Sequence, residues 1–147
     1  MVPDEPFGYT DCDIVPTEAC PLDAVAHLHR LMDEHQRPKV GLGLYLDDVP
    51  ADMPCLGWER ELVSVQRETQ TVVSGCAVFD SLIDTTFALY EAGAAFQYEA
   101  LRTGAPYLAR HNSPAWYGGE LDDEDRYYLE RAETGPTGSS WKEALGD

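Results

Sequence analysis

Cysteine has the widest chemical range of the residue types in this sequence, since a thiolate can bind a metal or attack a carbonyl group. The chain has four cysteines, Cys12, Cys20, Cys55 and Cys76. None belongs to the CxxC pairs typical of zinc ribbons, although Cys12 and Cys20 could share a zinc ion with a histidine. The first residues, MVPDEPFGYTD, lack the basic and apolar parts of an export signal, so we expect no disulfide bonds. Buried, unreactive thiols are the favoured interpretation, with no metal and no cofactor.

His27 and His29 resemble a pair of metal ligands, but their spacing argues against such a site. Both fall in a predicted helix, where side chains two positions apart point about 200° away from each other. His27 and His35 are two turns apart, which is too far for one ion to bind both. We therefore predict ordinary surface and boundary histidines.

Two further constellations could support catalysis. Cys76 and His111 are the one nucleophile and base that can be paired, but no GxSxG elbow is present and nothing in the sequence brings them together. Asp47, Asp48 and Asp52 could hold Mg²⁺ or Ca²⁺, which prefer oxygen ligands, although a solvated acidic loop explains them as well. We therefore predict no catalytic residue.

Aromatic residues become frequent toward the C-terminus, in sequence that reads as loop or weak helix. They are Tyr107, Trp116, Tyr117, Tyr127, Tyr128 and Trp141. These side chains either cover the domain's own sheet or contact another chain, as Tyr and Trp often do at interfaces. On the second interpretation, the predicted partner-binding residues are Trp116, Tyr117, Tyr127, Tyr128, Trp141 and Leu145.

The charge balance of the chain is unusual. Its 147 residues include 27 acidic and 10 basic ones, for a net charge of −17, and the only lysines are Lys39 and Lys142. A halophilic host or a high-GC genome is the favoured explanation, and mimicry of nucleic acid is the alternative. Without a basic patch we expect no direct nucleic-acid binding, and no apolar run approaches the roughly 20 residues of a membrane span.

The elements that would position these residues follow from hydrophobic periodicity. Pro21 to about Gln36 is a predicted helix, with Leu22, Val25, Leu28 and Met32 as its buried stripe. Residues 39–46 alternate as a strand, and its glycines at 41 and 43 would let a helix lie close. Residues 61–80 are rich in β-branched side chains, which favours two strands joined by a tight, glycine-free turn at 68–70. Helical spacing also fits this segment in part.

The most prominent predicted element is a long helix that begins at Ser81 and ends near Arg102. Ser81 and Asp84 resemble a capping box, and Phe87, Tyr90, Phe96 and Leu101 lie on its wide apolar face. Gly93 would lie in the middle of this helix, at a cost of about 1 kcal/mol relative to alanine. We expect this helix to form the core.

The predicted fold class is therefore α+β, with a small, largely antiparallel sheet of about three to four strands packed by one long helix. Residues 1–19 would form an extended arm, with Phe7 and Tyr9 docked on the body or on a neighbouring chain, of which the body is favoured. Residues 20–110 would form the core domain. Residues 111–147 would be an irregular acidic segment with a short helix at about 121–133 and a tail.

The favoured functional hypothesis is a non-catalytic structural or interaction subunit of a larger assembly, such as a component of a viral particle, from a halophilic or high-GC host. Its partners would be other protein chains, as a homo-oligomer or mixed assembly, in the cytoplasm or the virion. One alternative is an acidic nucleic-acid mimic that inhibits a basic partner. A second is a small enzyme that uses the acidic loop or Cys76.

Overall fold

The structure is a computed structural model, and it describes residues 3–51, 53, 59, 61, 70–73, 75–84, 86–112, 119–133 and 142. The strands are β1 (Phe7–Tyr9), β2 (Ile14–Pro16), β3 (Lys39–Gly41), β4 (Gly43–Leu44), β5 (Gln70–Val73), β6 (Cys76–Leu82), β7 (Ala88–Tyr90), β8 (Glu99–Thr103) and β9 (Leu108–His111). The helices are α1 (Ala24–His35) and α3 (Asp123–Arg131).

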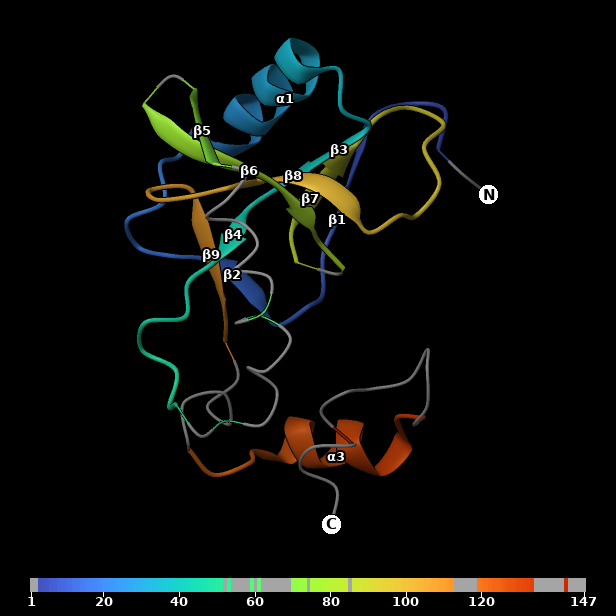
Figure 1. The fold of residues 1–147 in the computed structure, drawn as a ribbon. Helices are drawn as coiled ribbons and strands as arrows, with labels where there is room; N and C mark the ends of the chain where they lie inside the picture. The colour runs from blue at the N-terminus through green and yellow to red at the C-terminus, as the bar shows by residue number, and fades with distance from the viewer. Residues whose placement is uncertain are drawn as a thin grey trace.

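Six strands form one sheet in the order β1-β7-β3-β8-β6-β5, and three form a second sheet in the order β2-β9-β4. β3 and β8 are parallel, as are β4 and β9, whereas the other neighbours are antiparallel. Only Leu42 separates β3 from β4, and residues 104–107 connect β8 to β9. Residues 10–13 likewise connect β1 to β2, so three stretches of chain pass from the larger sheet into the smaller one (Figure 1).

This architecture corrects the predicted fold class. The chain is α+β, but its described residues form nine strands in two mixed sheets with two short helices. The small, largely antiparallel sheet of three to four strands packed by one long helix is wrong. Residues 7–16, predicted as an arm, supply β1 and β2, which pair with β7 and β9.

The long helix predicted from Ser81 is absent, and that segment holds the end of β6, then β7, a loop and β8. All three residues of β7 are buried, because both faces of this strand are covered: Leu89 belongs to the core beside α1, and Ala88 and Tyr90 belong to a second cluster. A strand buried on both faces is a continuous apolar run, which periodicity cannot distinguish from a piece of helix. Gly93 has a φ of 77°, a left-handed conformation that glycine adopts easily in the turn after β7.

The turn between β5 and β6 also differs from the prediction. It follows Val73 and includes Gly75, whose φ of 80° suits a tight turn. Of the predicted glycine-free turn at 68–70, residues 68 and 69 lie outside the described residues, and Gln70 is the first residue of β5. The first of the two predicted strands lies mostly outside the described residues. The second becomes a hairpin, in which Val73 lies opposite Cys76 and Val72 lies opposite Ala77.

The helix predicted from Pro21 to about Gln36 is confirmed as α1, although it begins at Ala24; it ends at His35 and is capped by Gln36 in a left-handed conformation. Leu28 and Met32 are buried as predicted, but Leu22 and Val25 are exposed. Leu22 precedes the first helical residue, so it does not share the helical periodicity. The buried face of α1 is made instead by His27, Leu28, Leu31 and Met32.

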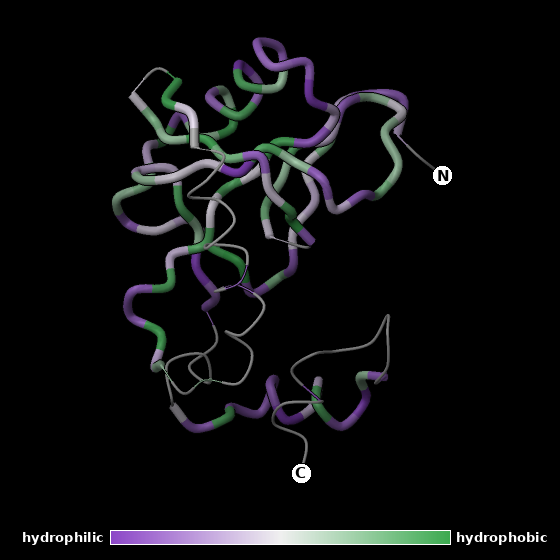
Figure 2. Tube along the Cα trace, in the orientation of Figure 1, coloured by the Kyte–Doolittle hydropathy of each residue, from purple (hydrophilic) through white to green (hydrophobic). Residues whose placement is uncertain are grey.

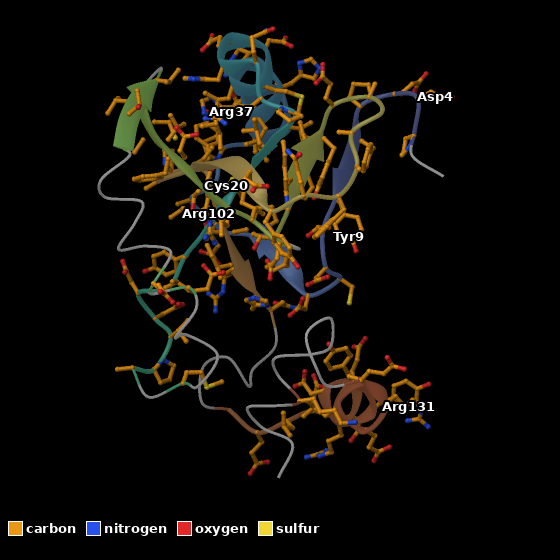
Figure 3. All side chains as sticks on the ribbon, turned by 45° about the vertical axis from the view of Figure 1, so that its right-hand side comes forward. Asp4, Tyr9, Cys20, Arg37, Arg102 and Arg131 are labelled. Atoms are coloured by element: carbon orange, nitrogen blue, oxygen red, sulfur yellow. The ribbon has the colours of Figure 1, made fainter. Side chains whose placement is uncertain are left out.

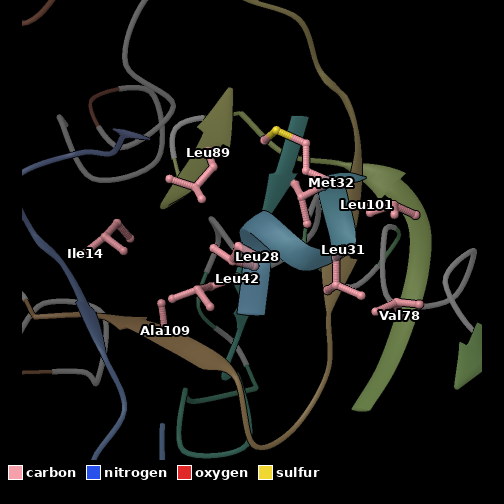
Figure 4. Packing of buried hydrophobic residues seen from close by; sticks show 10 residues of the cluster. Ile14, Leu28, Leu31, Met32, Leu42, Val78, Leu89, Leu101 and Ala109 are labelled. Carbon is pink, nitrogen blue, oxygen red and sulfur yellow. The ribbon is translucent and has the colours of Figure 1, made fainter. Parts of the chain in front are cut away.

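The main core lies between α1 and the sheets (Figure 4). Leu28, Leu31 and Met32 of α1 pack there, and a fully buried side chain of this size contributes about 1.5–3 kcal/mol. The other members of the cluster are Ile14, Val40, Leu42, Val78, Leu89, Leu101 and Ala109. A second cluster is formed by Ile83, Ala88, Tyr90 and Ala100, with Phe7 and Ala94 packed against it.

Gly41 and Gly43 permit close approach, as predicted, but their neighbours are strands and loops and not a helix. A methyl group on Gly41 would lie 2.7 Å from both Ile83 Cδ1 and the Phe87 carbonyl oxygen. At Gly43 it would overlap the Thr103 carbonyl oxygen. Glycine is needed here because backbone and side chains of the segment 83–88, of β8 and of β9 pass so near.

The short helix predicted at 121–133 is confirmed as α3. Asp122 and Asp125 form a reciprocal capping box, and carboxylates in the first turn suit the positive end of the helix dipole. In Figure 1, α3 lies apart from both sheets at the foot of the view. Figure 2 shows it as mostly hydrophilic, and Leu129 is its one buried residue.

Candidate interaction surfaces

Four of the six predicted partner-binding residues, Trp116, Tyr117, Trp141 and Leu145, lie outside the described residues. The other two, Tyr127 and Tyr128, are neighbours on α3. Tyr127 is 60% exposed and Tyr128 is 49% exposed. The guanidinium carbon of Arg131, labelled in Figure 3, lies 3.9 Å from the Tyr127 ring centroid, a cation–π contact that supports the ring in its exposed position. We refer to Tyr127, Tyr128 and Arg131 as the α3 surface.

A second group of exposed aromatic side chains lies at the β1 edge of the larger sheet. Tyr9, Phe96 and Tyr98 are 46%, 51% and 51% exposed, and we refer to them as the aromatic patch. The Tyr9 and Phe96 centroids are 6.1 Å apart at 71°, and those of Phe96 and Tyr98 are 5.4 Å apart at 81°. These edge-to-face contacts join β1 to the loop that precedes β8.

Sequence reasoning missed most of this patch. The predicted long helix placed Phe96 in its buried stripe, whereas the real segment is a loop. The prediction that Phe7 and Tyr9 dock on the body is confirmed, since Phe7 stacks on Tyr90 at 5.0 Å and Tyr9 meets Tyr90 edge to face at 6.5 Å. The spacing of Phe96 and Tyr98, two apart on either side of Gln97, was the available signal for an extended segment.

Lys39 lies beneath the aromatic patch with no exposed surface. Its Nζ donates hydrogen bonds to the carbonyl oxygens of Ile83, Asp84 at 3.3 Å and Gln97 at 2.7 Å. These acceptors come from the segment after β6 and from the loop before β8. The ammonium group therefore holds together two segments that both lie far from Lys39 in the sequence.

The surroundings of Lys39 change its titration. Its Nζ lies 5.0 Å from the Tyr90 ring centroid and 5.1 Å from that of Phe96. Burial lowers the pKa of Lys39 to about 8, and the negative charges of Asp84 and Glu99, which raise the pKa, offset burial only in part. Burial likewise raises the pKa of Tyr90 to about 12, and within the described part of the chain its hydroxyl oxygen has no hydrogen-bond partner.

The proposed nucleophile and base are not brought together. Cys76 is buried, and its Sγ donates to the carbonyl oxygens of Ala77 at 3.2 Å and Gly104 at 3.5 Å. Burial raises the pKa of the Cys76 thiol, which disfavours the reactive thiolate. His111 lies at the end of β9, where its Nδ1 is 2.7 Å from Asp13 Oδ2.

The Asp13–His111 pair links the segment before β2 to the end of β9. Burial by itself raises the pKa of Asp13, but the hydrogen bond and the charge of His111 hold the pKa below its ordinary value. The backbone continues the same contact, since the Asn112 amide donates to the Asp13 carbonyl oxygen at 2.6 Å. We interpret the Asp13–His111 pair as a structural contact that stabilises the pairing of β2 with β9.

His27 is buried, which contradicts its prediction as a surface or boundary histidine. Its ring stacks on Tyr107 at 3.9 Å, and the Tyr107 hydroxyl donates to Asp23 at 3.1 Å. Burial and the nearby Arg30 lower the pKa of His27, so the neutral imidazole is favoured. Tyr107 therefore packs against the protein's own core. His29 lies on the exposed side of α1, as predicted, 3.4 Å from Asp33.

The predicted acidic loop contains an ion pair, in which Asp48 Oδ2 lies 3.4 Å from Arg110 Nη1. Asp52 and Cys55 lie outside the described residues. Cys12 is exposed and Cys20 is partly buried. Within the described part of the chain, no group of three or more His, Cys, Asp or Glu side chains is placed to hold a metal ion.

Arg102, predicted to close the long helix, lies instead in β8 and is buried. Its Nη2 donates to Glu59 Oε2 at 2.9 Å, while its Nε and Nη1 have no hydrogen-bond partner among the described residues. Removing either member of such a pair leaves an uncompensated buried charge, which typically costs about 3–5 kcal/mol. The contact ties β8 to the segment at residue 59.

No family model, curated protein or solved structure matches this chain. In the part of the chain that the structure describes, neither helix has the length and apolar character needed to cross a bilayer.

Proposed function

We propose that this protein is a non-catalytic interaction subunit that associates with a second copy of itself through the α3 surface. The observation that carries the proposal is the exposure of two adjacent tyrosines, Tyr127 and Tyr128, on a helix with one buried residue. Tyrosine provides a large, rigid contact area and is enriched at protein interfaces.

The charges of α3 favour a second copy as the occupant. The helix begins with Asp123, Glu124 and Asp125 and has Arg131 in its last turn. Two such helices packed antiparallel about a two-fold axis would place the acidic start of each beside Arg131 of the other. The same arrangement would bring the tyrosines of the two copies close together, near the centre of the contact.

The non-catalytic part of the proposal is supported by the state of the candidate groups. The Cys76 thiol is buried with a raised pKa, and His111 is paired with Asp13. The net charge of −17 supports a halophilic or high-GC host as the wider context, in which the protein would belong to a particle or other assembly.

The test is the mass of the protein in solution, measured by light scattering at low salt and in molar KCl. We expect a dimer or higher oligomer under at least one condition, and we expect the Tyr127→Ala/Tyr128→Ala double variant to be monomeric with unchanged circular dichroism. Val72→Ala, which alters an exposed side chain on β5, is the control and should keep the wild-type mass.

A wild-type monomer at both salt concentrations would refute self-association and would favour the acidic-mimic alternative. An oligomer that the double variant leaves intact would move the interface away from α3. Association that requires molar KCl would support salt adaptation, because added salt screens the repulsion between highly acidic subunits.

A further inference from the structure

The aromatic patch differs from the α3 surface in the charges around it. The segments that carry its three rings are residues 3–11 and 83–99, and every charged side chain in them is a carboxylate. These are Asp4, Glu5, Asp11, Asp84, Glu91 and Glu99. The two segments lie side by side, since the Gly93 amide donates to the Pro3 carbonyl oxygen at 3.0 Å (Figure 3).

The rings of the patch form two corners. Phe96 stands at 71° to Tyr9 and at 81° to Tyr98, so each neighbouring pair presents nearly perpendicular walls. Perpendicular aromatic walls are the arrangement that surrounds cations in aromatic cages, because each ring presents a negative face to the charge. All three rings are about half exposed, so their outer parts are open to solvent.

The protein itself places a cation against this ring cluster. Lys39 Nζ lies about equally far from the centroids of Tyr90 and Phe96, at 5.0 and 5.1 Å, on the buried side. Its charge is offset by three carbonyl oxygens and by the nearby Asp84 and Glu99. Lys39 thus occupies the buried side of these rings. The corners that Tyr9 and Tyr98 form with Phe96 are open to a ligand on the outer side.

These charges argue against a second copy of this chain as the occupant, since two such patches would bring their carboxylates face to face. The complementary partner is positively charged. Arginine suits the site better than lysine, because its planar guanidinium group stacks on an aromatic ring while its N–H groups reach neighbouring carboxylates.

We propose that the aromatic patch binds an arginine-bearing segment of a partner protein. An arginine side chain lies against Tyr9 or Tyr98, and carboxylates such as Glu91 and Glu99 accept hydrogen bonds from the segment. This surface is separate from the α3 surface, so it defines a second class of contact beyond self-association.

The test measures by calorimetry how tightly the full chain binds a short peptide that alternates arginine with glycine. Two matched peptides carry lysine or citrulline, an uncharged side chain with nearly the shape of arginine. We expect the arginine peptide to bind most tightly and the citrulline peptide least. Tyr9→Ala and Tyr98→Ala should each weaken arginine-peptide binding about fivefold, the effect of about 1 kcal/mol of cation–π attraction.

Matched variants separate the ring from the fold. Tyr9→Phe and Tyr98→Phe keep the ring and should retain binding, and Val72→Ala, on the distant β5, should bind as the wild type does. Circular dichroism of each alanine variant checks its fold.

Four results would overturn the proposal. Equal binding to Tyr9→Ala, Tyr98→Ala and the wild type would mean that the peptide responds only to the net charge. Citrulline binding as tight as that of arginine would exclude a cation site, and tighter lysine binding would exclude the guanidinium geometry. A dimer that Tyr98→Ala dissolves would identify the second copy as the occupant, and in that case the α3 proposal would fail as well.

Discussion

Raising the pH above about 8 should stabilise this protein through Lys39. The folded-state pKa of Lys39 is lowered to about 8 by burial, whereas its ordinary value is 10.5. Between these values the unfolded chain binds the proton more tightly than the folded chain does. Stability therefore increases as the pH rises through this window, because the cost of burying the charge disappears as the ammonium group loses its proton.

The size of the effect follows from the two pKa values. Linkage gives an increase in the free energy of unfolding of about 1.5 kcal/mol between about pH 8 and about pH 9.5. Other groups also titrate in this range, including Cys20 and Cys76, whose pKa values burial raises and which therefore act in the opposite direction. The difference between the wild type and Lys39→Met cancels their contribution.

The assay is urea unfolding at a series of pH values for the wild type, Lys39→Met and Lys142→Met. Methionine keeps most of the volume of the lysine side chain but cannot be charged. The wild-type stability should rise relative to Lys39→Met by the stated amount. Lys142→Met controls for the loss of one positive charge on a side chain that is less buried.

A constant difference between the wild type and Lys39→Met over this window would refute the reasoning. It would mean that the three carbonyl acceptors of Lys39 favour the ammonium form strongly enough to offset burial. The same pH dependence in all three proteins would assign the effect to other groups.

Three further predictions concern packing, ionisation and capping. Gly41→Ala should destabilise the fold by about 1–3 kcal/mol in thermal unfolding, because the new methyl group would overlap its neighbours, whereas Gly8→Ala, with 3.8 Å available, should not. Asp13→Asn should lower stability at neutral pH, and its deficit relative to the wild type should shrink as the pH falls toward and below 3.8, because the lowered pKa of Asp13 stabilises only the charged form. Asp122→Ala should cost α3 about 1 kcal/mol and reduce helical circular dichroism; an unchanged spectrum would contradict the observed cap.

Local chemistry in the sequence was sufficient for both helices. Leu28 and Met32 are one turn apart and mark the buried side of α1, and the acidic first turn marks the start of α3. Each signal lies within one helix, so it does not depend on what packs against that helix. The predicted burial of Leu22 and Val25 at the edge of the stripe was wrong, because the sequence does not show where the surface that covers the helix ends.

The candidate surfaces divide in the same way. Tyr127 and Tyr128 were predicted from composition and are exposed, but whether they bind a partner stays a prediction. The aromatic patch was missed, because its rings come from β1 and from a loop about 90 residues away along the chain. The burial of Lys39 was not predicted either, although its position directly before the apolar run Val40–Leu46 was the available signal for it.

The sequence by itself determined the α+β class, the two short helices, the acidic charge and the need for glycine at positions 41 and 43. Only the tertiary structure decided that the segment 81–103 contributes to β6, β7 and β8 and does not form a helix, because covering both faces of β7 removes the alternation that identifies a strand. It also decided the role of Lys39, whose carbonyl acceptors lie 44 to 58 residues further along the chain. A contact over that separation exists only once the sheet has formed.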